Sequence, residues 1–338
     1  MRDTINIISN PDADFLGHSV IEFLYHLDGP TWIDITGKDT SRTRVMTTLL
    51  HGNEPSGVKA IFNYLTDANR KQPLTNISFM ICSVKAALLE PDFTHRYLPG
   101  EPDMNRCFRP PFECMNGMLA KNILERISEL KPEAMIDVHN TSGSGPDFTI
   151  CSGHDSIYEI YAKNFSSRLI QTDLSLGSIM EADVGCPILT LECGGSFDLS
   201  ADLKAIDAIN QLVTHDDLFV DNNQPLNIYA HPLRFEIKDD VSIGYSEAPL
   251  DGIDVTLEAD IEVHNFGVTD KKCFLGWVGN KGLDYFTAID DTGHDIKDEL
   301  FYVDNGKLFT KKTLRLFMVT PRPEIAKKDC LFYLVMDD

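Results

Sequence analysis

The sequence has 338 residues, of which 43% are hydrophobic and 24% are charged, and its formal net charge is −22. This composition is ordinary for a globular protein, and the length favours one large domain with a smaller one. So acidic a surface repels phosphate groups, which argues against nucleic acids and anionic membranes as partners.

The chain shows no sign of membrane insertion or export. No apolar stretch approaches the roughly 20 residues that cross a bilayer, and residues 1–4 are not followed by the apolar stretch of a signal peptide. The eight cysteines include no C-x-x-C pair, which argues against zinc-knuckle and thioredoxin-like sites. We therefore expect a cytoplasmic protein with free thiols, several of them buried.

Short apolar segments alternate with amphipathic ones over the first two thirds of the chain. The predicted strands are 44–50 (RVMTTLL), 76–84 (NISFMICSV), 134–138 (AMIDV) and 187–191 (PILTL), and the predicted helices are 55–65, 116–130, 156–170 and 198–212. The strands are apolar on both sides, as in sheets that are covered on both faces. The alternation predicts an α/β domain with a mixed, mostly parallel sheet flanked by helices.

The pattern changes at 221–225 (DNNQP). Beyond it, 227–238, 253–263 and 313–319 are predicted strands joined by Gly, Asp and Asn turns, and no long amphipathic helix is apparent. We therefore predict one domain at 1–224 and a smaller β-rich C-terminal domain at 225–338.

Polar residues follow three of the predicted strands. HGNE occupies 51–54, DVHN occupies 137–140 and ECGG occupies 192–195. In an open α/β sheet, the carboxyl ends of the strands line the crevice in which ligands bind. We therefore expect these three segments to meet at one site.

His51, Glu54 and His139 form a common catalytic zinc set, which leaves one position for water. Gly52 permits the sharp turn that brings His51 and Glu54 to one ion. Asp137 shares a strand face with His139 and is placed to fix the tautomer of a ligand histidine. The alternative is that His51 and Glu54 cap the next helix and that His139 is a core histidine; the H-x-x-E spacing alone does not decide.

Five segments resemble, in order, the motifs of the succinylglutamate desuccinylase/aspartoacylase family, a branch of the zinc carboxypeptidase-like hydrolases. They are HGNEPSG at 51–57, RY at 96–97, DMNRCF at 103–108, DVHNTSG at 137–143 and TLECGG at 190–195. The resemblance implies a zinc carboxypeptidase-like fold and one Zn²⁺ per chain, bound by His51, Glu54 and His139.

The resemblance also implies roles for four further residues. Glu192 matches the general base that acts on a zinc-activated water, and Arg96 matches the arginine that polarises the scissile carbonyl. Asn105 and Arg106 match the pair that grips a substrate carboxylate. The implied activity is deacylation, in which the amide bond of a small N-acyl amino acid or similar carboxylate-bearing amide is cleaved. The partner is a small-molecule substrate, and the oligomeric state stays open.

The sequence departs from aspartoacylases in two places. The interval from Arg96 to Arg106 is longer than expected, which reshapes the pocket edge. In segment 301–312, Leu308 and Phe309 stand where a substrate-binding tyrosine is expected. The head group of the substrate is therefore open.

Other functions remain as alternatives. A zinc metallocarboxypeptidase acting on short peptides would use the same metal and Arg106, and a metal-binding protein without catalysis would have no need of Glu192. A hydrolase with Cys193 as nucleophile is a weaker alternative, and no G-x-S-x-G motif is present. Zn²⁺ is the default metal, but the same ligands also accept cobalt or manganese.

Overall fold

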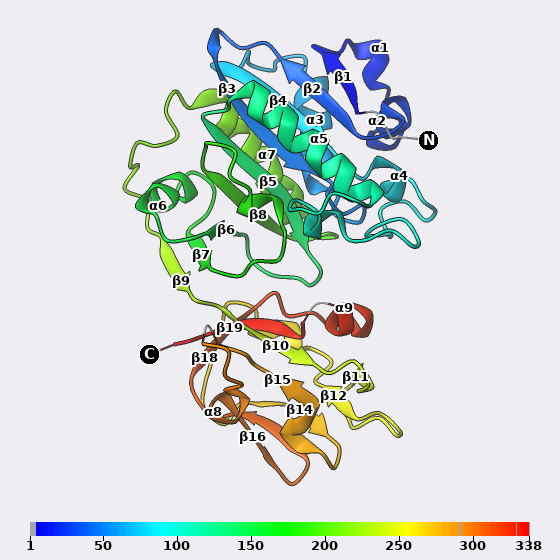
Figure 1. Cartoon of the computed structure of the whole chain (residues 1–338), viewed down its shortest axis with the longest axis vertical. Helices are drawn as coiled ribbons and strands as arrows, with labels where there is room; N and C mark the ends of the chain where they lie inside the picture. Colours follow the sequence, from blue (N-terminus) through cyan, green and yellow to red (C-terminus); the bar gives the residue numbers. More distant parts are fainter. Residues whose placement is uncertain (1–4, 291, 329, 338) are drawn as a thin grey trace. The chain divides into compact units, whose positions relative to one another are not determined.

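The computed structural model describes residues 5–290, 292–328 and 330–337. The chain divides into two compact units (Figure 1). The first comprises Met1–Asn140 and Asp147–Ile228, and the second comprises Thr141–Pro146 and Tyr229–Asp338. The domain boundary between residues 224 and 225 stays a prediction.

A mixed sheet is the centre of the first unit. Among the described residues it has nine strands in the order β1-β2-β4-β3-β5-β8-β6-β7-β9. The pairs β1–β2, β3–β4, β3–β5 and β6–β7 are parallel, whereas β2–β4 and β6–β8 are antiparallel. The strands are β1 (Asn6–Ser9), β2 (Thr31–Ile35), β3 (Asp39–Thr48), β4 (Thr75–Ile81), β5 (Ala134–Thr141), β6 (Phe148–Ser152), β7 (Arg168–Thr172), β8 (Ile188–Gly195) and β9 (Asn227–Ala230). The predicted mixed, mostly parallel sheet is confirmed.

Helices cover both faces of this sheet. They are α1 (Ala13–Leu16), α2 (Val20–Leu27), α3 (Ser56–Thr66), α4 (Val84–Ala87), α5 (Met115–Leu130), α6 (Ser156–Ala162) and α7 (Leu199–Thr214), with 3₁₀ turns η1 (Met104–Arg106) and η2 (Ile179–Glu181). Helix α5 lies on one face, and α3 and α7 lie on the other (Figure 1). In the part of the chain that the structure describes, no helix combines the length and apolar character that crossing a membrane requires.

The two faces carry separate cores because side chains of a strand alternate between them. Val45 and Met135 pack in the core under α5, whereas their neighbours Met46 and Ile136 pack in the core under α3 and α7. This alternation decides which polar side chains at the strand ends share a face. In β5, the odd-numbered residues face α5.

The predicted helix at 156–170 is wrong in its second half. Helix α6 ends at Ala162, and the chain then turns into strand β7. The Asn164 side chain stabilises this turn, since its Nδ2 donates to the carbonyl oxygens of Tyr161 at 3.0 Å and Leu218 at 2.8 Å. Apolar residues at helical spacing therefore belong to two short elements joined by a turn.

The second unit is rich in β-structure, as predicted. Its described residues form two five-stranded sheets, β13-β18-β19-β10-β15 and β11-β12-β14-β17-β16. The strands are β10 (Leu233–Ile237), β11 (Ile243–Tyr245), β12 (Val255–Leu257), β13 (Val268–Thr269), β14 (Phe274–Val278), β15 (Phe286–Thr287), β16 (Phe301–Asp304), β17 (Lys307–Thr310), β18 (Leu314–Phe317) and β19 (Phe332–Met336), and the helices are α8 (Lys297–Leu300), α9 (Pro323–Lys328), η3 (Ile261–His264) and η4 (Gly282–Tyr285).

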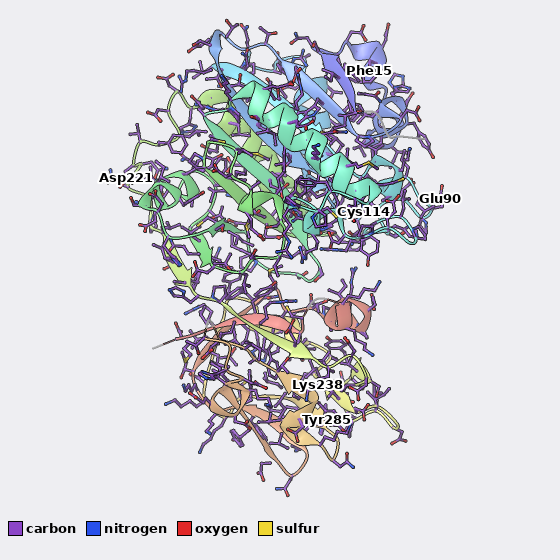
Figure 2. All side chains as sticks on the ribbon, viewed as in Figure 1. Phe15, Glu90, Cys114, Asp221, Lys238 and Tyr285 are labelled. Atoms are coloured by element: carbon purple, nitrogen blue, oxygen red, sulfur yellow. The ribbon has the colours of Figure 1, made fainter. Side chains whose placement is uncertain are left out.

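Aromatic rings fill the core of this unit. Phe235 lies 4.2 Å from the Phe301 ring and 4.8 Å from the Phe286 ring, measured between centroids. Tyr285, which Figure 2 labels, is buried in the same core. The predicted strand at 253–263 is shorter than expected, because its second half forms η3.

Candidate metal centre

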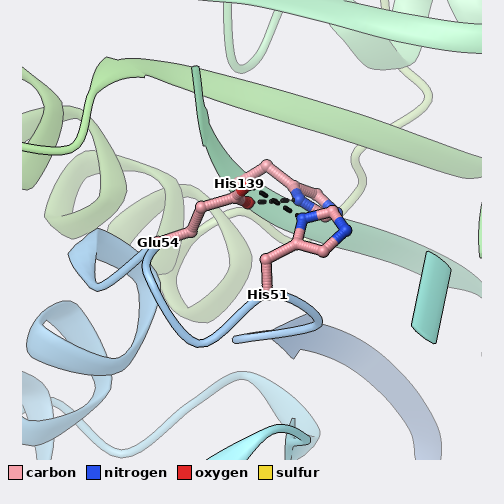
Figure 3. A group of neighbouring side chains, drawn as sticks. All are labelled: His51, Glu54 and His139. Atoms are coloured by element: carbon pink, nitrogen blue, oxygen red, sulfur yellow. Dashed lines mark hydrogen bonds and ion pairs between the residues drawn. The ribbon is translucent and has the colours of Figure 1, made fainter. Parts of the chain in front are cut away.

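His51, Glu54 and His139 converge at the carboxyl ends of two parallel strands (Figure 3). His51 and Glu54 lie on the turn between β3 and α3, and His139 lies within β5. All three side chains are buried, and one ligand atom from each lies within 4.8 Å of the others. Nδ1 of His51 is 2.8 Å from Oε1 of Glu54, and Nδ1 of His139 is 2.6 Å from Oε2.

Gly52 is required for the turn that carries two of these residues. A Cβ atom at this position would lie 2.6 Å from the backbone nitrogen of Ala87 and 2.7 Å from the carbonyl oxygen of His95. The turn therefore runs directly against α4 and the segment before Arg96. This close packing fixes the backbone between His51 and Glu54.

A second layer of carboxylates holds the outer nitrogen of each imidazole ring. Nε2 of His51 lies 2.9 Å from Oδ1 of Asp103, and Nε2 of His139 lies 2.6 Å from Oδ2 of Asp137. Thr47 donates to the other oxygen of Asp137 at 2.6 Å. When both rings donate from Nε2, the lone pair of each Nδ1 is directed at Glu54, which is the tautomer that a metal ligand needs. The predicted role of Asp137 fits this geometry.

The electrostatics of the cluster favour a cation at its centre. Burial by itself would raise the pKa of Glu54, but the charges of His51 and His139 outweigh burial and hold the pKa below its ordinary range. Burial opposes charge on His139, yet Asp137 and Glu54 raise its pKa well above the usual value. The carboxylates thus create a field that favours positive charge. Two imidazole nitrogens and a carboxylate oxygen in such a field fit Zn²⁺.

The sequence predicted that Glu192 follows a strand that ends at residue 191. In the structure, Glu192 lies within strand β8. It is 6% exposed, and its Oε2 has no hydrogen-bond partner among the described residues. The pKa of Glu192 is raised to about 7, mainly by burial; the charges of Glu54 and Asp137 also raise it, and those of His139 and His51 oppose the increase. A buried carboxylate oxygen without a hydrogen-bond partner is costly, which is typical of a group with a chemical use.

Arg96 is part of the same cluster. Its Nη1 lies 3.2 Å from Oε1 of Glu54, and its Nε donates to Oδ2 of Asp103 at 3.0 Å. The longer interval after Arg96 therefore does not remove the guanidinium from the site. Its role towards a carbonyl group stays a prediction.

Asn105 and Arg106 lie on η1 beside the histidines. Nδ2 of Asn105 is 3.5 Å from Nε2 of His139, and its Oδ1 accepts from the backbone N–H of Ile179 at 3.0 Å. Arg106 Nη1 donates to the carbonyl oxygen of Asn105 at 3.0 Å. The half-buried Arg106 is placed next to the metal centre, and its binding of a carboxylate stays a prediction.

Asp103 is the residue that the sequence reasoning missed. It lies in the DMNRCF motif, but no role was assigned to it. Its carboxylate accepts from His51, from Arg96 and from the backbone N–H of Asn105, the last at 2.8 Å. Burial opposes ionisation, yet His51, Arg96 and Arg106 hold the pKa of Asp103 well below its usual range. Asp103 thus links a metal ligand to the predicted substrate-binding residues.

Comparison with known proteins was made at the level of sequence and of structure. No protein-family model matches the sequence, and no curated protein matches it significantly. A succinylglutamate desuccinylase/aspartoacylase from Rhodobacter sphaeroides is 15% identical with a TM-score of 0.55, over 87% of this chain and 84% of that chain. The succinylglutamate desuccinylase from Chromobacterium violaceum is 15% identical with a TM-score of 0.52, over 88% of this chain and 85% of that chain. Murine aminoacylase 3 is 14% identical with a TM-score of 0.53, over 88% of this chain and 96% of that chain.

At sequence identities this low, the structural similarity establishes the fold, and the chemistry has to be argued from the site residues. The similarity covers most of this chain and most of each solved structure. The chain therefore has the fold of the succinylglutamate desuccinylase/aspartoacylase structures, as its motifs indicated.

Proposed function

We propose that this chain is a zinc-dependent hydrolase that cleaves the amide bond of a small N-acyl amino acid or a similar carboxylate-bearing amide. One observation carries the proposal: the buried His51-Glu54-His139 cluster interacts electrostatically with the buried Glu192, whose Oε2 has no hydrogen-bond partner among the described residues. The fold supports it, because the solved structures that share this fold are named desuccinylases, an aspartoacylase and an aminoacylase. Each of those names refers to removal of an acyl group.

His51, Glu54 and His139 would hold one Zn²⁺ per chain. When bound, Zn²⁺ acts as a Lewis acid that polarises a carbonyl group and lowers the pKa of water to about 7. Asp103 and Asp137 keep the two imidazole rings oriented by accepting from Nε2. Glu54 is in its ionised form because its pKa is low, so it contributes full negative charge to the site.

Glu192 is the proton carrier of the proposed reaction. In the metal-free chain its pKa is raised to about 7, and a carboxylate of raised pKa suits a group that accepts a proton from the attacking water and returns it to the nitrogen of the leaving amine. Arg96 places a guanidinium beside Glu54, where it stabilises the negative charge that develops on the carbonyl oxygen. Arg106 would bind the carboxylate of the substrate in bidentate fashion.

The proposal is tested by supplying a panel of amides to the zinc-loaded protein. The panel contains N-acetylaspartate, N-succinylglutamate and other N-acyl amino acids, together with short peptides, and release of the free amine is measured. We expect turnover of at least one N-acyl amino acid. Glu192→Gln should bind zinc as the wild type does and lose turnover by about 100-fold or more. Glu129→Gln, which changes an exposed carboxylate on α5, is the matched control and should retain full activity.

Three results would contradict parts of this assignment. Cleavage of short peptides without any activity on single N-acyl amino acids would identify a carboxypeptidase instead. Tight zinc binding with no hydrolysis of any amide would identify a metal-binding protein without catalysis, and undiminished turnover by Glu192→Gln would remove the general base.

A further inference from the structure

The segment 175–181 (SLGSIME) contacts η1, the turn that carries the predicted substrate-binding residue Asn105. The backbone N–H of Ile179 donates to Oδ1 of Asn105 at 3.0 Å. The backbone N–H of Phe108 donates to the carbonyl oxygen of Gly177 at 3.0 Å. These two hydrogen bonds join η1 and the residues after it to one short segment that lies far away in the sequence.

Gly177 is the point at which the two backbones approach most closely. Its φ is +84°, and a Cβ atom there would lie 2.6 Å from the carbonyl oxygen of Arg106 and 3.1 Å from Nε of Arg109. Glycine adopts this φ without strain and leaves room for the contact. Arg109 contacts the segment as well, since its Nη1 donates to the carbonyl oxygen of Ser175 at 3.2 Å. Direct backbone contact therefore sets the distance between the segment and η1.

The carboxylate of Glu181 holds the segment in its conformation. Its Oε1 accepts from the backbone N–H groups of Leu176 at 2.9 Å and Ser178 at 3.1 Å, and from the Ser178 hydroxyl at 2.7 Å. Its Oε2 accepts from the backbone N–H of Gly177 at 2.9 Å. Burial by itself would raise the pKa of Glu181, but these hydrogen bonds hold the pKa below its ordinary value. One ionised carboxylate thus binds the backbone donors of three consecutive residues.

The segment also determines which way the Asn105 amide points. A backbone N–H can only donate, so the contact with Ile179 identifies the Asn105 oxygen and leaves Nδ2 on the other side. There Nδ2 lies 3.5 Å from Nε2 of His139, which itself lies 2.6 Å from Oδ2 of Asp137. When this Nε2 donates to Asp137, it cannot accept from Asn105. The Asn105 side chain, which is 8% exposed, therefore directs an N–H donor at the metal centre, where a substrate oxygen would accept it.

We propose that Glu181 is a positioning residue for substrate binding, which acts by holding the segment 175–181 so that Ile179 fixes the amide of Asn105. Asn105 is predicted to bind the substrate carboxylate and not the metal. Loss of the Glu181 carboxylate should therefore raise KM, with little change in kcat or in zinc affinity. This kinetic consequence rests on the proposed function, whereas the mechanical coupling of the segment to η1 does not.

The coupling is tested without substrate, by hydrogen–deuterium exchange of the full chain. In Glu181→Gln, one acceptor oxygen is replaced by an NH₂ group that faces backbone donors. We expect peptides that cover 175–181 and 104–109 to exchange about fivefold faster or more. Glu22→Gln is the matched control, because Glu22 accepts from the backbone N–H of His18 at 2.9 Å at the start of α2. This control should leave both peptides unchanged.

The route through Asn105 is tested with a double-mutant cycle on whichever N-acyl amino acid of the panel is turned over. Glu181→Gln should raise KM about fivefold or more and keep kcat within about twofold, at unchanged zinc affinity. Glu181→Gln should add nothing to the KM of Asn105→Ala, because the group through which it acts is already absent. Gly177→Ala displaces the segment but retains the carboxylate of Glu181, so it should raise KM in the same way.

Four outcomes would overturn the proposal. They are faster exchange in 175–181 but not in 104–109, an unchanged KM in Glu181→Gln, additive effects in the double variant, and a loss of zinc affinity that accompanies the rise in KM. The last two would indicate that Glu181 only stabilises the fold. If the wild-type chain turned over no amide at all, the proposed function would be contradicted, and the exchange experiment would still decide whether Glu181 holds η1 in place.

Discussion

Replacement of Asp103 tests the candidate metal centre without replacing a candidate ligand. Its Oδ1 accepts from His51 Nε2 and from the Asn105 backbone, and its Oδ2 accepts from Arg96. Asparagine has the same shape but only one acceptor oxygen. In Asp103→Asn, the amide NH₂ must face either the His51 ring or the Arg96 guanidinium. The first orientation favours the wrong tautomer of His51, and the second places two donors against each other.

Loss of a carboxylate that orients a metal ligand typically lowers metal affinity by about 10- to 100-fold. That factor corresponds to about 1.4–2.7 kcal/mol of binding free energy. We expect Asp103→Asn to lose zinc affinity within this range, measured by competition with a chromophoric chelator. Asp34→Asn is the matched control, since Asp34 also pairs with an arginine, Arg126 at 2.8 Å, but contacts no candidate ligand. Equal zinc affinity of Asp103→Asn and Asp34→Asn would refute the orienting role of Asp103.

Three further predictions concern the pKa of Glu192, the contribution of Arg44 to stability and the binding of substrate by Arg106. Because the pKa of Glu192 rises from 4.5 to about 7 on folding, the metal-free wild type should lose more stability than Glu192→Gln as pH increases through this window. This additional loss of unfolding free energy is of the order of 3 kcal/mol, and urea unfolding of both proteins at about pH 5 and about pH 8 measures it. A stability difference between the two proteins that does not change with pH would contradict the prediction. Arg44 is fully buried and donates to Glu133 at 2.6 Å and to a carbonyl oxygen at the end of α7. Arg44→Met should therefore lower the free energy of unfolding by about 3 kcal/mol in urea titrations. An unchanged free energy of unfolding would refute a stabilising role of Arg44. Arg106→Ala should raise KM for carboxylate-bearing substrates about tenfold or more with little change in kcat, and an equal loss with an uncharged analogue would exclude a carboxylate clamp.

The convergence of the candidate ligands could be predicted because the relevant information is local. His51 and Glu54 share one turn, and His139 lies at the carboxyl end of an apolar segment. Parallel pairing of β3 with β5 brings these segments together, and that pairing follows from the alternation of strands and helices. The sequence therefore indicated the convergence before any coordinates.

Contacts between distant loops could not be predicted in the same way. The link from Asp103 to His51 spans 52 positions and depends on how the loop before α5 folds back over the strand ends. No periodicity describes such a loop.

The position of Glu192 shows how strand geometry sets the chemistry. Residues 188, 190 and 192 of β8 lie on one face, and Ile188 packs in the core under α5, as Met135 of β5 does. Glu192 therefore shares a face with Asp137 and His139, whereas Cys193 points to the opposite core with Leu189 and Leu191. A cysteine on that face is shielded from the metal centre by the sheet itself, which argues against Cys193 as a nucleophile. The same alternation that builds two apolar cores thus places the carboxylate, and not the neighbouring thiol, on the face that carries the candidate metal centre.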